Sequence, residues 1–268
     1  MNILRIFDNY DALKKQLVFI TGAPRSGTSM LAKVVDAHPH IAVLMENIFG
    51  NRRRHCLRAD FWESYKKLRK EVAKTYAKLD EPIVGNKVCS PDVWSADDIH
   101  RFCRLFLDFQ IIFVVRDPIH VALSRFKRED YVTEFNNKAR QNILLDFRTQ
   151  FLTYSSSWRQ SIETFWKLRD GHGDKTHIVY YEDFCNNFER HAQYLCDFLG
   201  IPFSENMLNW YRLPHHNAHG HLQKDIKYPD APVKCANSHL QENELPEELK
   251  EALASIEWFR VLWEKRQL

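Results

Sequence analysis

Glycine and proline are scarce in this chain, at eight and ten of its 268 residues. Long flexible linkers are rich in these residues, so the sequence leaves little room for one. No internal repeat or low-complexity segment is visible either. A chain of this length can bury a substantial core, and we expect a single domain over residues 1–268.

Long apolar runs and paired cysteines are also lacking. No stretch approaches the roughly 18 apolar residues of a membrane-spanning helix. The first residues, MNILRIFDNYDALKKQ, carry acids early and have no uninterrupted apolar core, which is unlike a secretory signal. The cysteines are scattered without a CxxC pair: Cys56, Cys89, Cys103, Cys185, Cys196 and Cys235. Buried thiols in a reducing compartment explain this pattern, and we expect a cytoplasmic protein.

What the chain does contain is an alternation of short apolar runs and helical patterns. Apolar runs that favour strands lie at residues 17–21, 41–44, 83–88, 111–115 and 177–181. Helical spacing is found at residues 28–37, 61–79, 96–108, 140–169, 186–199 and 246–265. This alternation predicts an α/β fold, with a parallel sheet flanked by helices and ligands bound beyond the carboxyl ends of the strands.

The segment Gly22-Ala23-Pro24-Arg25-Ser26-Gly27-Thr28 joins the first strand to the first helix. Glycines let the backbone approach an anion, and the amides at a helix start point toward it. The two glycines have the spacing of an NTP-binding P-loop, but that loop requires a lysine directly after the second glycine. Here Thr28-Ser29 follows and the cation is Arg25, inside the loop. The segment is therefore P-loop-like, or else a plain turn with a solvated arginine.

A second motif, IIFVVRDPIHVALSR, places Arg116 at a strand end and Ser124 eight residues later. Arginine offers a planar fork to a phosphate, and a hydroxyl two turns along the next helix can reach the same group. The alternative is that Asp117 caps that helix and Arg116 lies on the surface. Two motifs in this order make a phosphate-binding site the stronger interpretation.

The sequence PRSGTSML, followed by DAHPHI, resembles the 5′-phosphosulfate loop of sulfotransferases that use 3′-phosphoadenosine 5′-phosphosulfate (PAPS). The pattern is most similar to tyrosylprotein sulfotransferases and to bacterial relatives with a PRSGT loop. The resemblance covers residues 17–46, 83–91 and 111–125, and more loosely 155–203. It implies a fold related to nucleotide kinases, with a PAPS-binding half over 17–125 and a half over 126–268 that completes the donor and acceptor sites.

The resemblance also implies roles for the donor-binding residues. Arg116 and Ser124 would hold the 3′-phosphate, and Arg25 would stabilise the bridging oxygen and the 5′-phosphate. The 5′-phosphosulfate would receive hydrogen bonds from Ser26, Gly27, Thr28 and Ser29. Sulfuryl transfer depends mainly on alignment and fixed positive charge. We expect no metal, because sulfate carries less charge than a terminal phosphate.

Two further residues complete the expected catalytic set. Lys87, in VGNKVCSPD, matches a strand-end lysine of the family, although Pro91 lies farther along than the pattern requires; the alternative is a surface lysine at a strand edge. Glu46 lies 21 residues after Arg25, as the catalytic glutamate of the tyrosylprotein enzymes does, and is the candidate general base. His38 and His40 remain rivals for that role, and Glu46 could instead be a capping residue.

Four histidines, His215, His216, His219 and His221, crowd into seven residues and suggest a metal site. No neighbouring cysteine or acid completes a ligand set, and the resembled family needs none. Bacterial relatives carry a loop hereabouts that closes over the nucleotide, and His219-Gly220-His221 is a candidate for it. Tyr181 lies near the donor by resemblance, or is ordinary core.

The net charge of +3 is too small to predict nucleic-acid binding. A basic run does follow Glu46: Arg52, Arg53, Arg54, His55 and Arg58. Aromatic residues are too sparsely interleaved for a platform that binds single strands. The run is either a solvated face or a wall of the acceptor site that favours an anionic acceptor, such as an acidic peptide or a sulfated glycan.

We therefore predict an enzyme that transfers the sulfuryl group of PAPS to an acceptor hydroxyl on a glycan, a peptide tyrosine or a small alcohol. A kinase of the same fold is one alternative, but it needs a loop lysine and a magnesium-binding acid, and only Asp117 is suitably placed. A catalytically inert nucleotide-binding protein is the other, and the combined presence of Arg25, Glu46, Lys87, Arg116 and Ser124 disfavours it.

Overall fold

A computed structural model of the chain describes residues 14–45, 70–89, 95–106, 108–118, 120–121, 124, 143–217 and 219–224. Three expectations from the sequence lie outside these residues. They are the candidate base Glu46, the basic run over 52–58 and the closing helix over 246–265.

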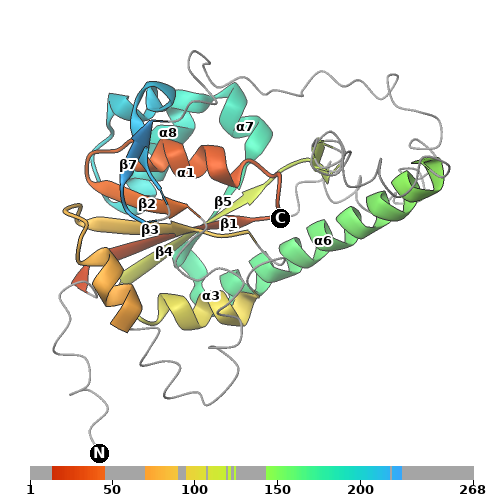
Figure 1. Ribbon diagram of the computed structural model, residues 1–268, viewed down its shortest axis with the longest axis horizontal. Coiled ribbons are helices and arrows are strands. Elements are labelled where there is room, and N and C mark those ends of the chain that lie inside the picture. Colours follow the sequence, from red (N-terminus) through yellow and green to blue (C-terminus); the bar gives the residue numbers. More distant parts are fainter. Residues whose placement is uncertain are drawn as a thin grey trace, which may run out of the picture.

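The centre of the fold is a five-stranded sheet whose strands all run parallel, in the order β2-β3-β1-β4-β5 (Figure 1). The strands are β1 Gln16–Gly22, β2 Ile41–Met45, β3 Ile83–Lys87, β4 Asp108–Val115 and β5 Thr176–Tyr180. The inner strands β1 and β4 are buried on both faces over residues 17–20 and 111–115, which explains why these segments are continuous apolar runs and not alternations. β3 is buried throughout as well, although its last two residues are polar. The predicted α/β class is confirmed.

Helices cover both faces of the sheet (Figure 1). One face carries α1 Thr28–Asp36, α7 Tyr181–Asn186 and α8 Phe188–Leu199, and the other carries α3 Ala96–Cys103 and the long α6 Ile143–His172. Short helical turns follow at η4 Gly173–Lys175, η5 Glu205–Met207 and η6 Trp210–Arg212. A small antiparallel hairpin, β6 Pro214–His216 with β7 Leu222–Lys224, ends the described part of the chain.

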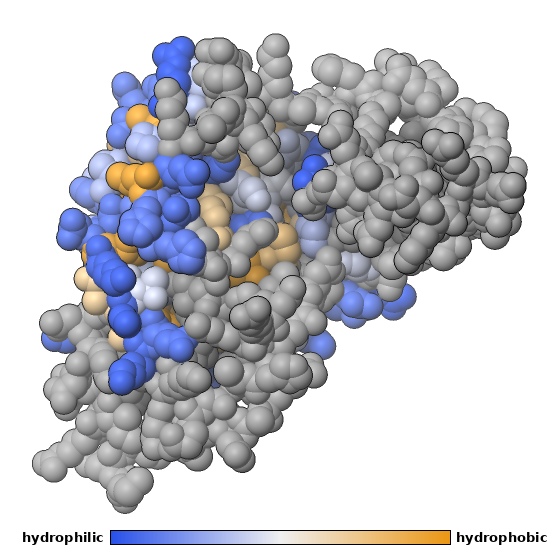
Figure 2. All heavy atoms as spheres, in the orientation of Figure 1, coloured by the Kyte–Doolittle hydropathy of each residue, from blue (hydrophilic) through white to orange (hydrophobic). Residues whose placement is uncertain are grey.

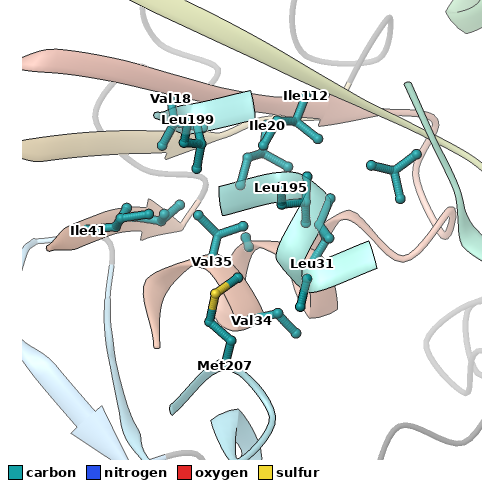
Figure 3. Close-up of a cluster of buried hydrophobic side chains, with 14 of the residues drawn as sticks. Val18, Ile20, Leu31, Val34, Val35, Ile41, Ile112, Leu195, Leu199 and Met207 are labelled. Atoms are coloured by element: carbon teal, nitrogen blue, oxygen red, sulfur yellow. The ribbon is translucent and has the colours of Figure 1, made fainter. Parts of the chain in front are cut away.

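Side chains alternate between the two faces along each strand and so build two separate cores. Val18 and Ile20 of β1 pack with α1 and α8, and this core is drawn in Figure 3. Leu17 and Phe19 point to the other face, where they join the core that includes α3 and the helical segment over 70–76. Burial on both faces fixes the register of the sheet, because a slip of one residue would exchange the two sets.

Several boundaries differ from the predicted ones. The helix predicted over 96–108 ends at Cys103, and β4 begins at Asp108, three residues before the predicted strand. Two of the first three residues of β4, Asp108 and Gln110, are polar, so the continuous apolar run begins only at Ile111, yet these residues pair with β1 from Gln16 onward. Tyr181 was predicted to end a strand and instead begins α7, which also contains the expected cap Glu182-Asp183.

The described surface is ordinary for a globular domain. On the face drawn in Figure 2 it is mainly hydrophilic, with small hydrophobic areas. Large exposed hydrophobic side chains within the described ranges are Trp166, Tyr194 and Leu222. Of the two neighbouring rings on α6, Phe165 is buried and Trp166 is partly exposed. No helix in the described part of the chain is long and apolar enough to cross a bilayer.

Candidate active site

The predicted donor-binding residues meet at the carboxyl ends of β1, β3 and β4. Ile20 of β1 pairs with Lys87 of β3, and Gly22 pairs with Val114 of β4, two residues before Arg116. Since neighbouring strands lie about 4.8 Å apart, these ends form one edge of the sheet. The loop over 22–28 starts at this edge and leads into α1.

The loop has a strained backbone. Arg25 has a φ of 75°, which makes it the non-glycine residue with a positive φ in the described part of the chain. Such a conformation costs on the order of 1 kcal/mol or more and persists only where surrounding contacts enforce it. One such contact is visible, because Nη1 of Arg116 donates a hydrogen bond to the carbonyl oxygen of Arg25 at 3.1 Å.

Gly27 is required at its position for two reasons. Its φ is 92°, and a Cβ added to it would lie 2.3 Å from Cδ2 of Tyr181. The ring of Tyr181 therefore packs directly on the loop backbone where α1 begins. This contact places Tyr181 beside the phosphate loop, which its predicted position at the end of a strand did not indicate.

The start of α1 is open to an anion. Its N-cap residue, Gly27, provides no side-chain hydrogen bond, and the first amides of any helix lack acceptors within the helix. The hydroxyl of Ser26 is fully buried and has no hydrogen-bond partner among the described residues. Thr28 is buried and Ser29 is exposed at the same helix start. Unused donors and the positive end of a helix dipole together fit a phosphate or sulfate group.

Arg116 is 6% exposed and is held from several sides. Its guanidinium carbon lies 4.4 Å from the ring centroid of Tyr181, a stacked arrangement of cation and aromatic face. The indole Nε1 of Trp158 donates to the carbonyl oxygen of Arg116 at 2.9 Å. The Nε of Arg116 is buried and has no hydrogen-bond partner within the described residues. The alternative interpretation, in which Arg116 lies on the surface, is therefore wrong.

The two predicted phosphate-binding motifs contact each other. Nε of Arg25 donates to the hydroxyl of Ser124 at 3.1 Å, although the two residues are 99 positions apart. Because Arg116 also bonds the Arg25 carbonyl, the residues expected at the 5′ and 3′ ends of the donor form one connected group.

Lys87 is also part of this edge, at 1% exposure. Its Nζ lies 3.5 Å from the sulfur of Cys89, and that sulfur lies 3.9 Å from the hydroxyl of Thr28 in α1. The lysine is therefore a buried residue beside the phosphate loop, and the alternative of a surface lysine is wrong. Cys89 was not predicted; its place two residues after a strand-end lysine, on the same side of an extended chain, is the signal that could have identified it.

The candidate base Glu46 lies outside the described residues, and its role stays a prediction. The residue before it, Met45, ends β2 and pairs with Lys87 of β3.

His38 and His40, the rival bases, lie at the other edge of the sheet. They precede Ile41, the first residue of β2, whereas the phosphate loop lies at the carboxyl ends of the strands. Nδ1 of His38 accepts the amide of His40 at 3.1 Å, so Nε2 carries the proton and donates to the carbonyl oxygen of Pro202 at 2.9 Å. Burial and the nearby His40 lower the pKa of His38 in spite of that bond. The ring of His38 has no free lone pair and ties α1 to the chain near Pro202.

Half of the histidine cluster has a structural role. Asp36, at the end of α1, accepts hydrogen bonds from the Nδ1 and the amide of His216, both at 2.8 Å, and lies 3.3 Å from Nδ1 of His215. Burial would raise the pKa of Asp36, but its bonds to His215 and His216 hold it below its ordinary value. These contacts attach β6 to α1. No group of three possible metal ligands occurs in the described ranges.

Comparison with known proteins identifies the family of this chain. The sulfotransferase family model matches residues 17–205, more than half of the chain. The chain belongs to the sulfotransferase family. The predicted family and enzyme class are thereby confirmed.

Relatives with the same name recur among the matches. Protein-tyrosine sulfotransferase 1 of Danio rerio is 23% identical over 209 residues, which covers 72% of this chain and 55% of that protein. Protein-tyrosine sulfotransferase of Drosophila melanogaster is 26% identical over 211 residues, covering 72% of this chain and 40% of that protein. The chain thus spans about half the length of these relatives.

Solved structures share the fold. The sulfotransferase domain of the curacin biosynthetic pathway has a TM-score of 0.57 at 16% identity, covering 91% of this chain and 98% of that one. The sulfotransferase domain of the Synechococcus PCC 7002 olefin synthase has 0.55 at 21%, covering 90% and 94%. Mouse sulfotransferase SULT7A1, complexed with PAP, has 0.52 at 15%, covering 97% and 92%.

The expected cytoplasmic location is wrong. The matching relatives are protein-tyrosine sulfotransferases, which act in the Golgi lumen rather than in the cytoplasm. The expectation depended on scattered cysteines. Free thiols such as Cys103 and Cys196 are buried in the two cores, so they report packing and not the compartment.

Proposed function

We propose that this chain transfers the sulfuryl group of PAPS to an acceptor hydroxyl, releasing adenosine 3′,5′-bisphosphate (PAP). The observation that carries the proposal is the contact between Arg116 and Arg25 beside unused buried donors. The hydrogen bond runs from the Arg116 guanidinium to the main-chain carbonyl of Arg25, so it joins two cationic residues in one group. A nucleotide with phosphates at both its 5′ and 3′ positions would supply one anion to each arginine.

Each group of residues takes one part of the donor. Arg116 and Ser124 bind the 3′-phosphate. The 5′-phosphosulfate lies at the start of α1, where it accepts hydrogen bonds from Ser26, Gly27, Thr28 and Ser29. Arg25 and Lys87 balance the charge that develops on the bridging oxygen as the bond to sulfur breaks.

The transfer forms one bond and breaks one. The acceptor oxygen attacks sulfur, the bond between sulfur and the bridging oxygen breaks, and PAP leaves with that electron pair. The carboxylate of Glu46 accepts the proton of the hydroxyl. No redox step occurs.

Both predicted parts of the chain contribute to the donor site. Arg25 and Arg116 belong to the part over 17–125, whereas Trp158 and Tyr181, which contact Arg116, belong to the part over 126–268. This supports the division in which the second part completes the donor site.

For the acceptor, we propose a tyrosine hydroxyl in an acidic peptide. Two observations support this: relatives are protein-tyrosine sulfotransferases, and the sequence has a basic run over 52–58 directly after Glu46. The test is sulfate transfer from labelled PAPS to an acidic tyrosine peptide, its neutral counterpart, a simple phenol and a sugar. Equal transfer to the neutral and acidic peptides would remove the anionic preference, and transfer to the sugar alone would remove tyrosine.

Donor identity is tested separately by calorimetry with PAP, adenosine 5′-phosphate (AMP) and ATP with Mg²⁺. We expect PAP to bind most tightly, because only PAP offers both phosphates. Tight binding of ATP without binding of PAP would favour the kinase alternative. Binding of PAP without transfer to any acceptor would favour the inert nucleotide-binding protein.

A further inference from the structure

We propose that Trp158 of α6 is a positioning residue for the donor: it fixes Arg116 so that one defined edge of the guanidinium meets the 3′-phosphate. The inference rests on the proposed function, because it concerns the same donor site. It assigns a role to a residue on the sheet face opposite α1, where α6 lies (Figure 1).

The hydrogen bonds of Arg116 define that edge. In a guanidinium group, Nε–H and one Nη2–H lie parallel along one edge, and Nη1 lies on the other side. Nη1 of Arg116 is turned to the carbonyl oxygen of Arg25, at 3.1 Å. Nε is buried without a hydrogen-bond partner among the described residues. The edge formed by Nε and Nη2 is therefore the one that can bind a phosphate with two parallel hydrogen bonds.

The plane of the group is fixed by Tyr181, whose ring centroid lies 4.4 Å from the guanidinium carbon. These contacts restrain the side chain of Arg116 but not its main-chain carbonyl group. Arg116 comes one residue after β4 ends at Val115, so its carbonyl group is beyond the strand pairing. Trp158 supplies a donor there, from Nε1 to the Arg116 carbonyl oxygen at 2.9 Å.

Packing on this helix face is shared among several side chains. The same face also buries Ile162 and Phe165, and Phe165 lies 5.3 Å from Phe113 of β4 by ring centroids. Trp158 is 2% exposed, and a phenylalanine keeps an aromatic ring at this buried position. Phenylalanine lacks the indole N–H. Without this donor the Arg116 carbonyl group could rotate, and the Nε and Nη2 edge of the guanidinium would no longer be aligned with the phosphate.

The test compares Trp158→Phe with Trp166→Phe, which changes a partly exposed tryptophan on the same helix. Dissociation constants for PAP and AMP are measured by calorimetry, together with the melting temperature. We expect Trp158→Phe to weaken the binding of PAP by about tenfold, the effect of one buried hydrogen bond, and the binding of AMP by less than about twofold. Trp166→Phe should change neither. Equal weakening of PAP and AMP, or no weakening, would overturn the inference.

A second measurement needs no variant and applies if Trp158→Phe does not fold. In wild-type protein labelled with ¹⁵N-tryptophan, the assigned indole resonance of Trp158 should shift with PAP and remain in place with AMP. An unchanged resonance on saturation with PAP would overturn the positioning role. If wild-type protein binds no PAP at all, the proposed function fails, which is a different result from bound PAP with an unaffected Trp158.

Discussion

Nη1 of Arg116 donates a hydrogen bond to the carbonyl oxygen of Arg25 at 3.1 Å, across 91 positions of sequence. The bond joins the end of β4 to a strained residue of the loop after β1, and so connects the two phosphate sites of the proposed donor. Since Arg25 in turn bonds Ser124, the residues of both sites form one hydrogen-bonded group.

Arg116→Lys tests how much of this connection depends on the shape of the side chain. Lysine keeps the charge but loses the bidentate fork, the stacking on Tyr181 and the bond to Arg25. We expect PAP binding to weaken by about 100-fold or more in calorimetry, the effect of two charged hydrogen bonds. Arg159→Lys, at an exposed ion pair with Glu163, is the control and should bind PAP normally. Wild-type affinity in Arg116→Lys would mean that charge alone suffices.

Gly27→Ala should damage the loop. The new methyl group would lie 2.3 Å from the ring of Tyr181, at a φ of 92° that alanine rarely adopts. We expect a loss of about 2 kcal/mol or more in the free energy of unfolding and loss of PAP binding, measured by urea denaturation and calorimetry.

Gly171→Ala is the matched control for this change, because nothing lies within 4 Å of its added Cβ and it sits inside helix α6. Alanine there should leave PAP binding intact and raise stability by up to about 1 kcal/mol. If Gly27→Ala behaved like this control, the close packing of Tyr181 on the loop would be wrong.

The parts of the site that were predictable are those encoded locally. A strand, a loop and a helix start lie within one short segment, so Arg25 and Ser26 could be assigned from their neighbours in sequence. Arg116 and Ser124 follow the same logic within a second segment. Because the predicted sheet is parallel, both segments were expected at the same edge, where the carboxyl ends of the strands lie.

The contacts that support this site could not be predicted, because they are made across the fold. Trp158 has the pattern of an ordinary apolar helix position, and Tyr181 was expected near the donor only by resemblance. Packing alone shows that both contact Arg116. The role of the histidine cluster was hidden for the same reason. The acid that His215 and His216 bind is Asp36, some 180 positions earlier.

The attachment of β6 to α1 should depend on pH. Burial would lower the pKa of His216, but its bond to Asp36 and the nearby carboxylates of Asp36 and Glu81 raise it. A raised pKa stabilises the fold fully below the ordinary value of 6.5, and this contribution is lost as pH rises through the folded-state pKa. The lowered pKa of Asp36 acts in the opposite sense, stabilising above 3.8 and failing as pH falls below it.

His216→Gln tests the contribution to stability that is lost as pH rises. Below pH 6.5 we expect the variant to lose about 1 to 3 kcal/mol of unfolding free energy, and we expect the difference from wild type to shrink as pH rises further. Urea denaturation at several pH values measures it. His221→Gln, at an exposed histidine of the same hairpin, is the control and should have the stability of wild type. A difference that stays constant with pH would show that His216 acts by packing alone.

Glu46→Gln and His38→Gln distinguish the proposed base from its nearest rival. Glutamine cannot accept the acceptor proton, so Glu46→Gln should lower kcat by about 100-fold or more while PAP binds normally. His38 has both ring nitrogens occupied, by the amide of His40 and the carbonyl of Pro202, at the edge of the sheet away from the loop. His38→Gln should therefore lower the melting temperature and leave kcat of the folded enzyme nearly unchanged. Full turnover in Glu46→Gln, with a loss of kcat and no loss of stability in His38→Gln, would reverse the two assignments.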